Sequence, residues 1–103
     1  MADRKTADDS HTISATRRNG MLRREIWIDT VTGNVTRYNL AYINHAIYVG
    51  DNGRVVGYEN AHVRHHRHYK GNMEPVRFIS FKHTEKQFEQ AWLAAKDEKC
   101  IQP

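Results

Sequence analysis

The sequence contains little cysteine and has no long hydrophobic runs. Cys100 is the single cysteine among 103 residues. It cannot form an intramolecular disulfide, so a reducing compartment is the natural setting. The apolar runs are only a few residues long, and the first ten residues, MADRKTADDS, contain no apolar stretch. We therefore expect neither a signal peptide nor a membrane span, and we expect a cytoplasmic protein.

The familiar catalytic signatures are absent as well. The chain has no Walker phosphate loop, no G-x-S-x-G, no H-E-x-x-H and no C-x-x-C. The sequence therefore indicates none of the enzyme classes that these motifs mark, and we expect no cofactor.

Size and charge set broad limits on the fold and on its partners. A chain of 103 residues can bury one modest core, which predicts a single small domain. Sixteen Lys and Arg against twelve Asp and Glu leave a formal net charge of +4. This moderate excess favours an anionic partner such as RNA, DNA or an acidic protein, and it does not decide among them.

Turn signals at regular spacing predict a β-rich domain. Residues 1–10 are small, polar and charged, and we expect them to form a flexible arm before a domain over residues 11–103. Within the domain, Gly- and Asn-rich turns separate β-rich runs at residues 12–18, 21–29, 35–49, 54–60 and 76–81. The turns lie about ten residues apart, which leaves no room for the crossovers of a parallel sheet. We therefore predict an antiparallel β-meander of about five strands.

The last segment alone has a helical period. Its apolar side chains fall at i, i+3, i+4 and i+7, at Phe88, Ala91, Trp92 and Ala95. Thr84 and Gln87 match a capping box at its start. We expect this amphipathic helix to pack on the sheet, which makes the fold class α+β. Trp27 and Trp92 each lie in an apolar pattern, and we interpret both as core residues.

The most informative segment places four of the seven histidines within residues 62–68, interleaved with arginines. These groups suit the binding or cleavage of a phosphodiester. In an extended segment, one side would present His62, Arg64, His66 and His68. RNA cleavage without a metal needs a base for the 2′-hydroxyl, an acid for the leaving 5′-oxygen and a cation for the phosphoryl oxygens. The spacing permits that chemistry.

Candidate roles in this segment follow from residue type. Proton transfer, with a phenol assisting, is assigned to His65, His66, His68 and Tyr69. Contacts to nucleic-acid phosphate are assigned to His62, Arg64, Arg67 and Lys70. Glu59 and Asn60 stand just before the segment, where they could orient a histidine tautomer or cap the loop.

Two other interpretations of the segment stay open. A basic loop that only binds nucleic acid or a protein partner would have the same composition. His66 and His68, as H-x-H, could also bind one metal ion from a strand face. Two observations argue against a metal ion. No cysteine or nearby aspartate completes the ligand set, and Arg64 and Arg67 would repel the cation. We therefore expect no metal in the site.

The run NGRVVGYENAHVRHHRHYKG, followed by EPVRFISF and a closing helix, resembles the TumE-like toxins of prokaryotic type II toxin–antitoxin modules. That family combines a glycine–aromatic–acid–Asn segment, an H-x-x-H-H-R-H stretch, a strand with aromatic residues and a terminal helix. The resemblance covers about residues 37–95 and is strongest over residues 53–71. The matching positions are Gly57, Tyr58, Asn60, His62, His65, His66, Arg67, His68 and Gly71.

The resemblance implies a growth-inhibiting toxin that a co-encoded antitoxin neutralises. With the histidine-rich segment, it leads us to expect a toxin that cleaves RNA by metal-independent acid–base chemistry, with RNA and the cognate antitoxin as partners. A short meander leaves at least one strand edge unpaired. We expect residues 21–29 to be such an edge, where a partner or a second copy in a homodimer would add its own strand.

Overall fold

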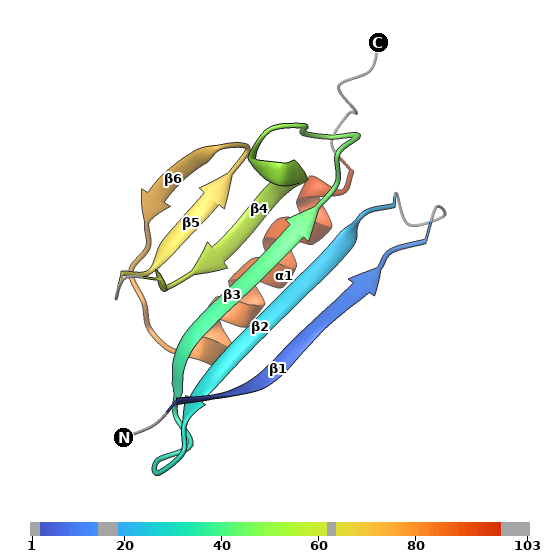
Figure 1. The fold of residues 1–103 in the computed structure, drawn as a ribbon. Helices are drawn as coiled ribbons and strands as arrows, with labels where there is room; N and C mark the ends of the chain where they lie inside the picture. Colours follow the sequence, from blue (N-terminus) through green and yellow to red (C-terminus); the bar gives the residue numbers. More distant parts are fainter. Residues whose placement is uncertain (1–2, 15–18, 62–63, 98–103) are drawn as a thin grey trace.

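Six antiparallel strands follow one another in chain order across a single sheet (Figure 1). The structure, a computed structural model, describes residues 3–14, 19–61 and 64–97. The strands are β1 (Asp3–Thr12), β2 (Met21–Asp29), β3 (Val35–Ile43), β4 (Arg54–Glu59), β5 (His66–Tyr69) and β6 (Asn72–Pro75), and α1 (Phe81–Ala95) follows them. The predicted α+β class, antiparallel meander and C-terminal helix are confirmed, with six strands.

The β5–β6 hairpin shows how local sequence sets the register. Its two-residue turn has Lys70 at φ 46° and Gly71 at φ 84°. Positive φ at both central positions is the type I′ turn, whose twist matches that of the paired strands. The turn brings Tyr69 opposite Asn72, and the pairing continues to His66 at the far end of β5.

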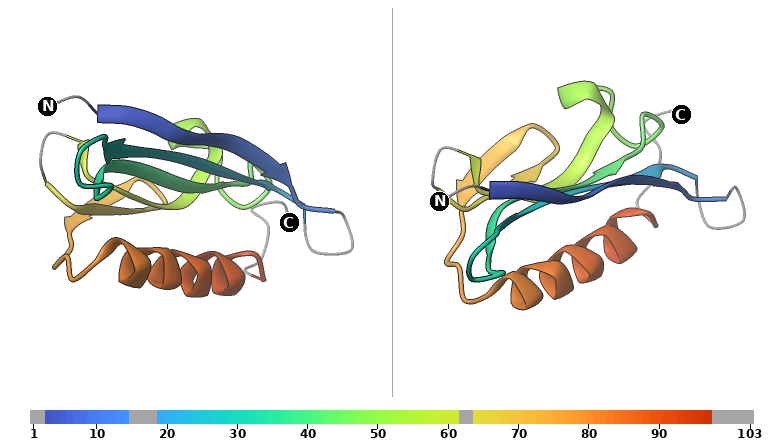
Figure 2. Two further views of the ribbon diagram at one scale, coloured as in Figure 1. Left: turned by 90° about the horizontal axis from the view of Figure 1, so that it is seen from below. Right: turned by 60° about the horizontal axis from the view of Figure 1, so that its bottom comes forward.

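The helix packs along one face of the sheet and begins earlier than the capping box predicts (Figure 2). Ser80 is the N-cap, and its Oγ accepts from the His83 amide at 3.1 Å. Thr84 is instead buried inside the helix. The early start places Phe81 against Tyr38, with ring centroids 5.4 Å apart. The predicted strand over residues 76–81 is also wrong, because β6 ends at Pro75 and residue 81 is helical.

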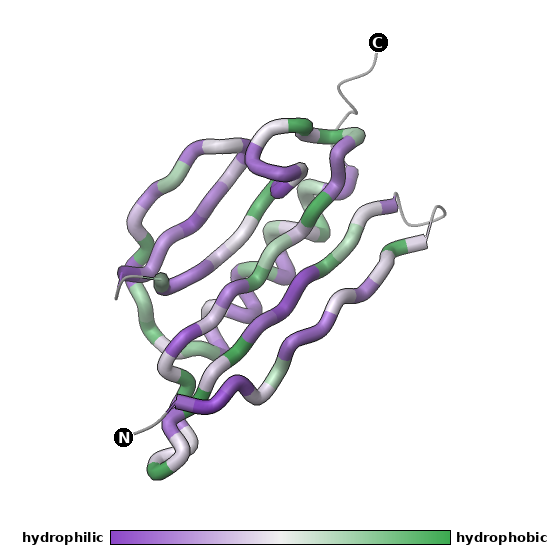
Figure 3. Tube along the Cα trace, viewed as in Figure 1, coloured by the Kyte–Doolittle hydropathy of each residue, from purple (hydrophilic) through white to green (hydrophobic). Residues whose placement is uncertain are grey.

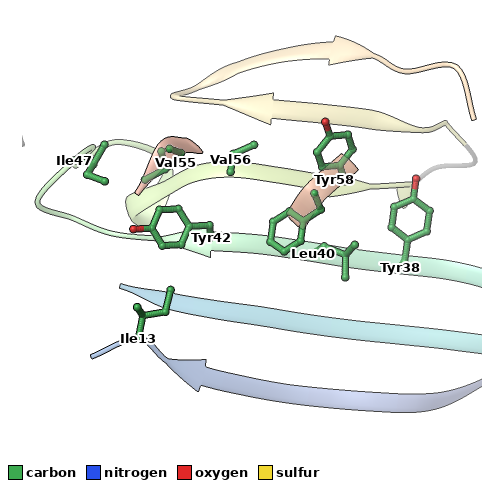
Figure 4. Close-up of a cluster of buried hydrophobic side chains, with 10 residues drawn as sticks. Ile13, Tyr38, Leu40, Tyr42, Ile47, Val55, Val56 and Tyr58 are labelled. Atoms are coloured by element: carbon green, nitrogen blue, oxygen red, sulfur yellow. The ribbon is translucent and has the colours of Figure 1, made fainter. Parts of the chain in front are cut away.

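The core lies between α1 and the strands β3 and β4 (Figure 4). Tyr58 of β4 meets Phe88 of α1 with nearly perpendicular rings, centroids 6.4 Å apart. Tyr42 of β3 is fully buried and meets Trp92, which is itself partly buried, at 5.9 Å. Trp92 therefore contributes to the core, as its helical spacing predicts.

Trp27 lies outside the core, which corrects the sequence interpretation. The buried neighbour Ile26 points towards the helix layer, and successive side chains of a strand point to opposite faces. Trp27 therefore faces away from α1. Two cations lie over its ring, with Lys5 Nζ at 4.8 Å and Arg37 Cζ at 4.7 Å from the centroid.

The first residues form a strand where a flexible arm is expected. Residues 3–12 pair with β2, from Asp3 opposite Asp29 to Thr12 opposite Met21. β1 is mostly hydrophilic (Figure 3). Side-chain ion pairs join it to β2, with Arg23 Nη2 at 2.7 Å from Asp8 Oδ1. Backbone pairing and these ion pairs hold a strand that has little apolar surface to bury.

The addition of β1 also corrects the predicted sheet edge. β2 has a neighbour on each side, so residues 21–29 cannot accept another strand. The edges of the sheet are β1 and β6. Within the described ranges, no helix is long and apolar enough to cross a bilayer.

We predict that Phe88→Ala lowers the free energy of unfolding by about 3–5 kcal/mol, because it empties a buried aromatic site in the core of a small domain. Leu93→Ala on the same helix is the control, since Leu93 is 42% exposed and its truncation should change stability by no more than ~0.5 kcal/mol. Urea unfolding measures both. Equal losses in the two variants would show that the buried face of α1 is assigned wrongly.

Candidate active site

His66 and His68 lie on the face of the sheet opposite α1, called the open face below. Tyr58 points towards the helix, so its strand neighbours Gly57 and Glu59 point away from it. β5 pairs with β4 so that Glu59 is opposite His66 and Gly57 is opposite His68. Directly opposed residues share a face. The pairing therefore gathers one carboxylate and two imidazoles on the open face.

Arg54 connects these groups by reaching across Gly57. A Cβ at position 57 would lie 2.9 Å from Arg54 Cδ, so the glycine leaves room for the arginine side chain. The guanidinium donates from Nε to Asp51 Oδ2 at 2.8 Å and from Nη1 to Glu59 Oε2 at 3.4 Å. Its Nη2 lies 3.1 Å from His68 Nδ1. One planar cation thus holds three side chains in place.

The contact with Arg54 also selects the tautomer of His68. A guanidinium has no acceptor, so His68 Nδ1 accepts and the proton of the neutral ring is on Nε2. Nε2 lies 2.8 Å from Glu59 Oε2, at an angle that falls short of a hydrogen bond. The His68 side chain is 12% exposed and that of Glu59 is 21% exposed. This Arg54–Glu59–His68 cluster is therefore sheltered but open to a ligand.

A hollow of about 450 Å³ adjoins the cluster on the open face. Across the strands, Arg23 is opposite Ala41, and Ala41 is opposite Gly57. These two small residues form a low floor between Arg23 and the cluster. Arg23 and Arg54 both line the hollow. Two cations beside a shallow floor suit a phosphate group.

Carboxylates balance the cations around this hollow. Glu25 lines it and accepts from Lys5 Nζ at 2.8 Å. The hydrogen bond from Lys5 holds the pKa of Glu25 below its ordinary value, although burial opposes the shift. Glu25 is therefore ionised at neutral pH. Arg23 Nη2 lies 3.6 Å from the same carboxylate oxygen, which positions the arginine beside the hollow.

Three of the predicted site residues do not share this face. Arg67 and Tyr69 alternate with the histidines along β5 and point to the other side. Tyr69 packs against the core, and Arg67 pairs with Glu74 at 3.1 Å. Lys70 lies in the turn, with its Nζ 5.4 Å from the Tyr69 ring centroid. The structure therefore separates them from His66 and His68.

His65 also lies apart, at the end of the sheet. Its Nδ1 is 2.8 Å from Tyr38 Oη, and its ring stacks on Phe78 with centroids 4.0 Å apart. Burial raises the pKa of Tyr38 to about 12, so the phenol keeps its proton at neutral pH. Burial, with a smaller contribution from the charge of His66, lowers the pKa of His65. At neutral pH, His65 is therefore a neutral ring whose Nδ1 shares a hydrogen bond with the Tyr38 hydroxyl.

The remaining predicted residues have separate places. Asn60 ties the end of β4 to β3, because its Oδ1 accepts from the Tyr38 amide at 2.8 Å and its Nδ2 donates to Thr36 O at 3.0 Å. Arg64 is exposed just before β5. His62 lies outside the described residues.

The residues that sequence reasoning missed are Arg54, Asp51 and Arg23. All three are common charged types near turns or in strands, and no spacing links them to the histidine segment. In the described part of the chain, no group of three or more His, Cys, Asp or Glu side chains is arranged to hold a metal ion.

Comparison with known proteins identifies no relative of this chain. No protein-family model matches the chain, and neither a curated protein nor a solved structure matches it. The likeness to TumE-like toxins stays a prediction from the residues that carry it.

The lowered pKa of His65 predicts a loss of stability in acid. The unfolded chain takes up this proton near the ordinary pKa of 6.5, whereas the folded protein takes it up only at lower pH. The contribution of His65 to the free energy of unfolding is therefore complete above about pH 6.5, and it falls as the pH drops below that value. We expect His65→Gln to lose less stability than wild type between about pH 7.5 and about pH 5, measured by urea unfolding. Equal losses would refute the shift.

Proposed function

We propose that this protein is a metal-independent endoribonuclease and the toxin of a toxin–antitoxin pair. The observation that carries the proposal is the Arg54–Glu59–His68 cluster, with His66 beside it on the open face. A carboxylate, an imidazole and a fixed cation within one small area are the groups that RNA cleavage requires.

The geometry supports a division of roles between Glu59 and His66. Opposed residues on paired strands have Cβ atoms about 5 Å apart, so both side chains reach the same phosphodiester. Glu59 takes the proton of the 2′-hydroxyl, whose oxygen attacks the phosphorus. The bond to the 5′-oxygen breaks, and protonated His66 gives its proton to that oxygen. The products are a 2′,3′-cyclic phosphate and a free 5′-hydroxyl.

Arg54 and His68 position the base and offset charge. His68 Nδ1 is already occupied by Arg54, so His68 cannot take a proton there unless the guanidinium moves. Arg54 instead donates to the Glu59 carboxylate, and His68 Nε2 lies 2.8 Å from the same carboxylate oxygen. Arg54 and Arg23 line the hollow in which charge on the phosphoryl oxygens would develop.

The biological role rests on the resemblance to TumE-like toxins. That resemblance implies growth inhibition and a co-encoded antitoxin. The net charge of +4 agrees with an RNA substrate.

A second candidate function, binding without cleavage, is favoured by Trp27. Its ring lies on the open face beside Lys5 and Arg37, and cations next to an aromatic ring suit contacts to a nucleic-acid strand without any chemistry. A protein of this type would bind single-stranded RNA and leave it intact.

We predict that Glu59→Gln and His66→Ala each lower the rate of RNA cleavage by ~10²- to 10⁴-fold, because each removes one proton-transfer group. Arg67→Ala is the matched control, since Arg67 is a cation of the same hairpin that faces the other side and should affect the rate little. Steady-state cleavage of a defined RNA with chelator present measures all three. Circular dichroism checks that each variant is folded.

The shape of the pH profile decides among the remaining interpretations. A bell-shaped dependence that survives chelation supports paired acid and base groups. Loss of cleavage on chelation would indicate a metal enzyme. Binding without turnover by folded wild type would leave the second candidate function.

Growth arrest provides an independent prediction. Induced expression of wild type in a bacterial host should slow growth, and Glu59→Gln at equal protein level should relieve the arrest, because arrest depends on cleavage. The measurement is the growth curve with the protein level checked by immunoblot. Equal arrest by both proteins would show that toxicity comes from binding alone.

A further inference from the structure

A second cavity, of about 510 Å³, lies at the end of the sheet, away from the Arg54–Glu59–His68 cluster. The starts of β1 and β3 and the segments that follow β4 and β6 form its walls. The residues that matter for its chemistry are Asp3, Thr36, Arg37, Asn60, His65 and Phe78. Its volume lies in the range of small-molecule and cofactor sites.

One wall of this cavity is an aromatic pair of which Phe78 is exposed. The rings of His65 and Phe78 stack with centroids 4.0 Å apart and planes 14° apart. Tyr38 lies nearly parallel to both, with its centroid 5.7 Å from His65 and 6.4 Å from Phe78. Phe78 nevertheless remains 39% exposed. A large apolar ring that is held in place and still reaches solvent is a ready platform for another flat ring.

The hydrogen bonds around His65 fix this platform. Tyr38 Oη occupies Nδ1, which leaves Nε2 for a hydrogen bond with a ligand in the cavity that His65 lines. Asn60 is fully engaged with the backbone of β3 and serves as a clamp. The lowered pKa of His65 keeps the ring neutral at physiological pH. His65 is therefore suited to stacking as a neutral ring and to forming one hydrogen bond with a ligand.

The polar rim matches the edge of a nucleobase and its phosphate. The carboxylate of Asp3 can accept from a base amino or imino group, while His65 Nε2 can form a hydrogen bond with a polar group on the base edge. Arg37 lines the cavity and also lies over Trp27 on the open face. It therefore connects the cavity to the open face. A nucleotide, unlike an unmodified peptide side chain, carries a phosphate that this cation can hold.

The path from the cavity to the cluster is short. Arg37 and Asn39 are two positions apart on β3, which is about 7 Å along a strand, and Asn39 is opposite Glu59. An RNA strand whose phosphate contacts Arg37 would therefore pass its neighbouring phosphodiester to Glu59 and His66.

We propose that this cavity is a subsite for one unpaired nucleobase of the substrate RNA, which stacks on the Phe78–His65 pair. The subsite rests on the proposed ribonuclease function, and it makes the enzyme specific for single-stranded RNA with a base preference beside the cleaved bond. Stacking of one base on an aromatic side chain changes affinity by roughly tenfold to a hundredfold.

The test uses full-length protein, the four nucleoside monophosphates as binding probes and short oligoribonucleotides as substrates. We expect Phe78→Leu to weaken monophosphate binding and to raise KM about tenfold or more, with little change in kcat. Phe78→Trp should restore both, because it restores a stacking ring. Ile79→Ala is the matched control, since Ile79 is adjacent and 65% exposed.

The outcomes separate the two proposals. Phe78-dependent binding of a monophosphate by a protein that cleaves no RNA would support the subsite and refute the ribonuclease. RNA cleavage that depends on Glu59 but keeps wild-type KM and base preference in Phe78→Leu would overturn the subsite. A fall in kcat alone, not restored by Phe78→Trp, would also overturn it, because it would show a structural role for the ring.

Discussion

The alternation of side chains along β5, set by its pairing with β4, is the constraint on which both sites depend. Glu59 opposite His66 and Gly57 opposite His68 place two imidazoles on the open face, beside a carboxylate. A shift of one residue in the pairing register would turn His66 and His68 to the other face and bring Arg67 to the open face. The type I′ turn after Tyr69 opposes such a shift, because its two positive-φ residues fix where β6 begins.

Charge pairing on the open face contributes little to stability but holds the side chains in position. Arg54 and Glu59 are partly buried, and ordering partly desolvated charges contributes little net stability. Their pairing does hold a carboxylate in one orientation next to a histidine. Preorganised groups of this kind need no rearrangement when charge develops on a substrate. The free energy that supports this arrangement has to come from the opposite face, where Tyr42, Leu40 and Val56 are buried against the helix layer.

The single histidine-rich segment thus serves two surfaces. His66 and His68 extend towards the open face, whereas the adjacent His65 joins the aromatic stack at the end of the sheet. Arg37 is common to both regions, since it lines the end cavity and lies over Trp27. In the function proposed above, the two regions would bind one single strand of nucleic acid, with stacking at one end and proton transfer at the other.

The sequence by itself determined the fold class, because local patterns carry it. Closely spaced Gly and Asn turns exclude crossovers, and the i, i+3, i+4, i+7 stripe of Phe88 and Trp92 makes a helix with one apolar face. The sequence also identified the histidine segment, since a cluster of histidines can be recognised without a structure. It missed β1, whose charged residues form a strand only because β2 supplies backbone and ion-pair partners. It likewise misplaced Trp27, since an apolar run does not say which face a strand will bury. Tertiary structure alone decided that Arg54 joins Glu59 and His68 while Tyr69 leaves them, because register and sheet face depend on partners distant in the chain.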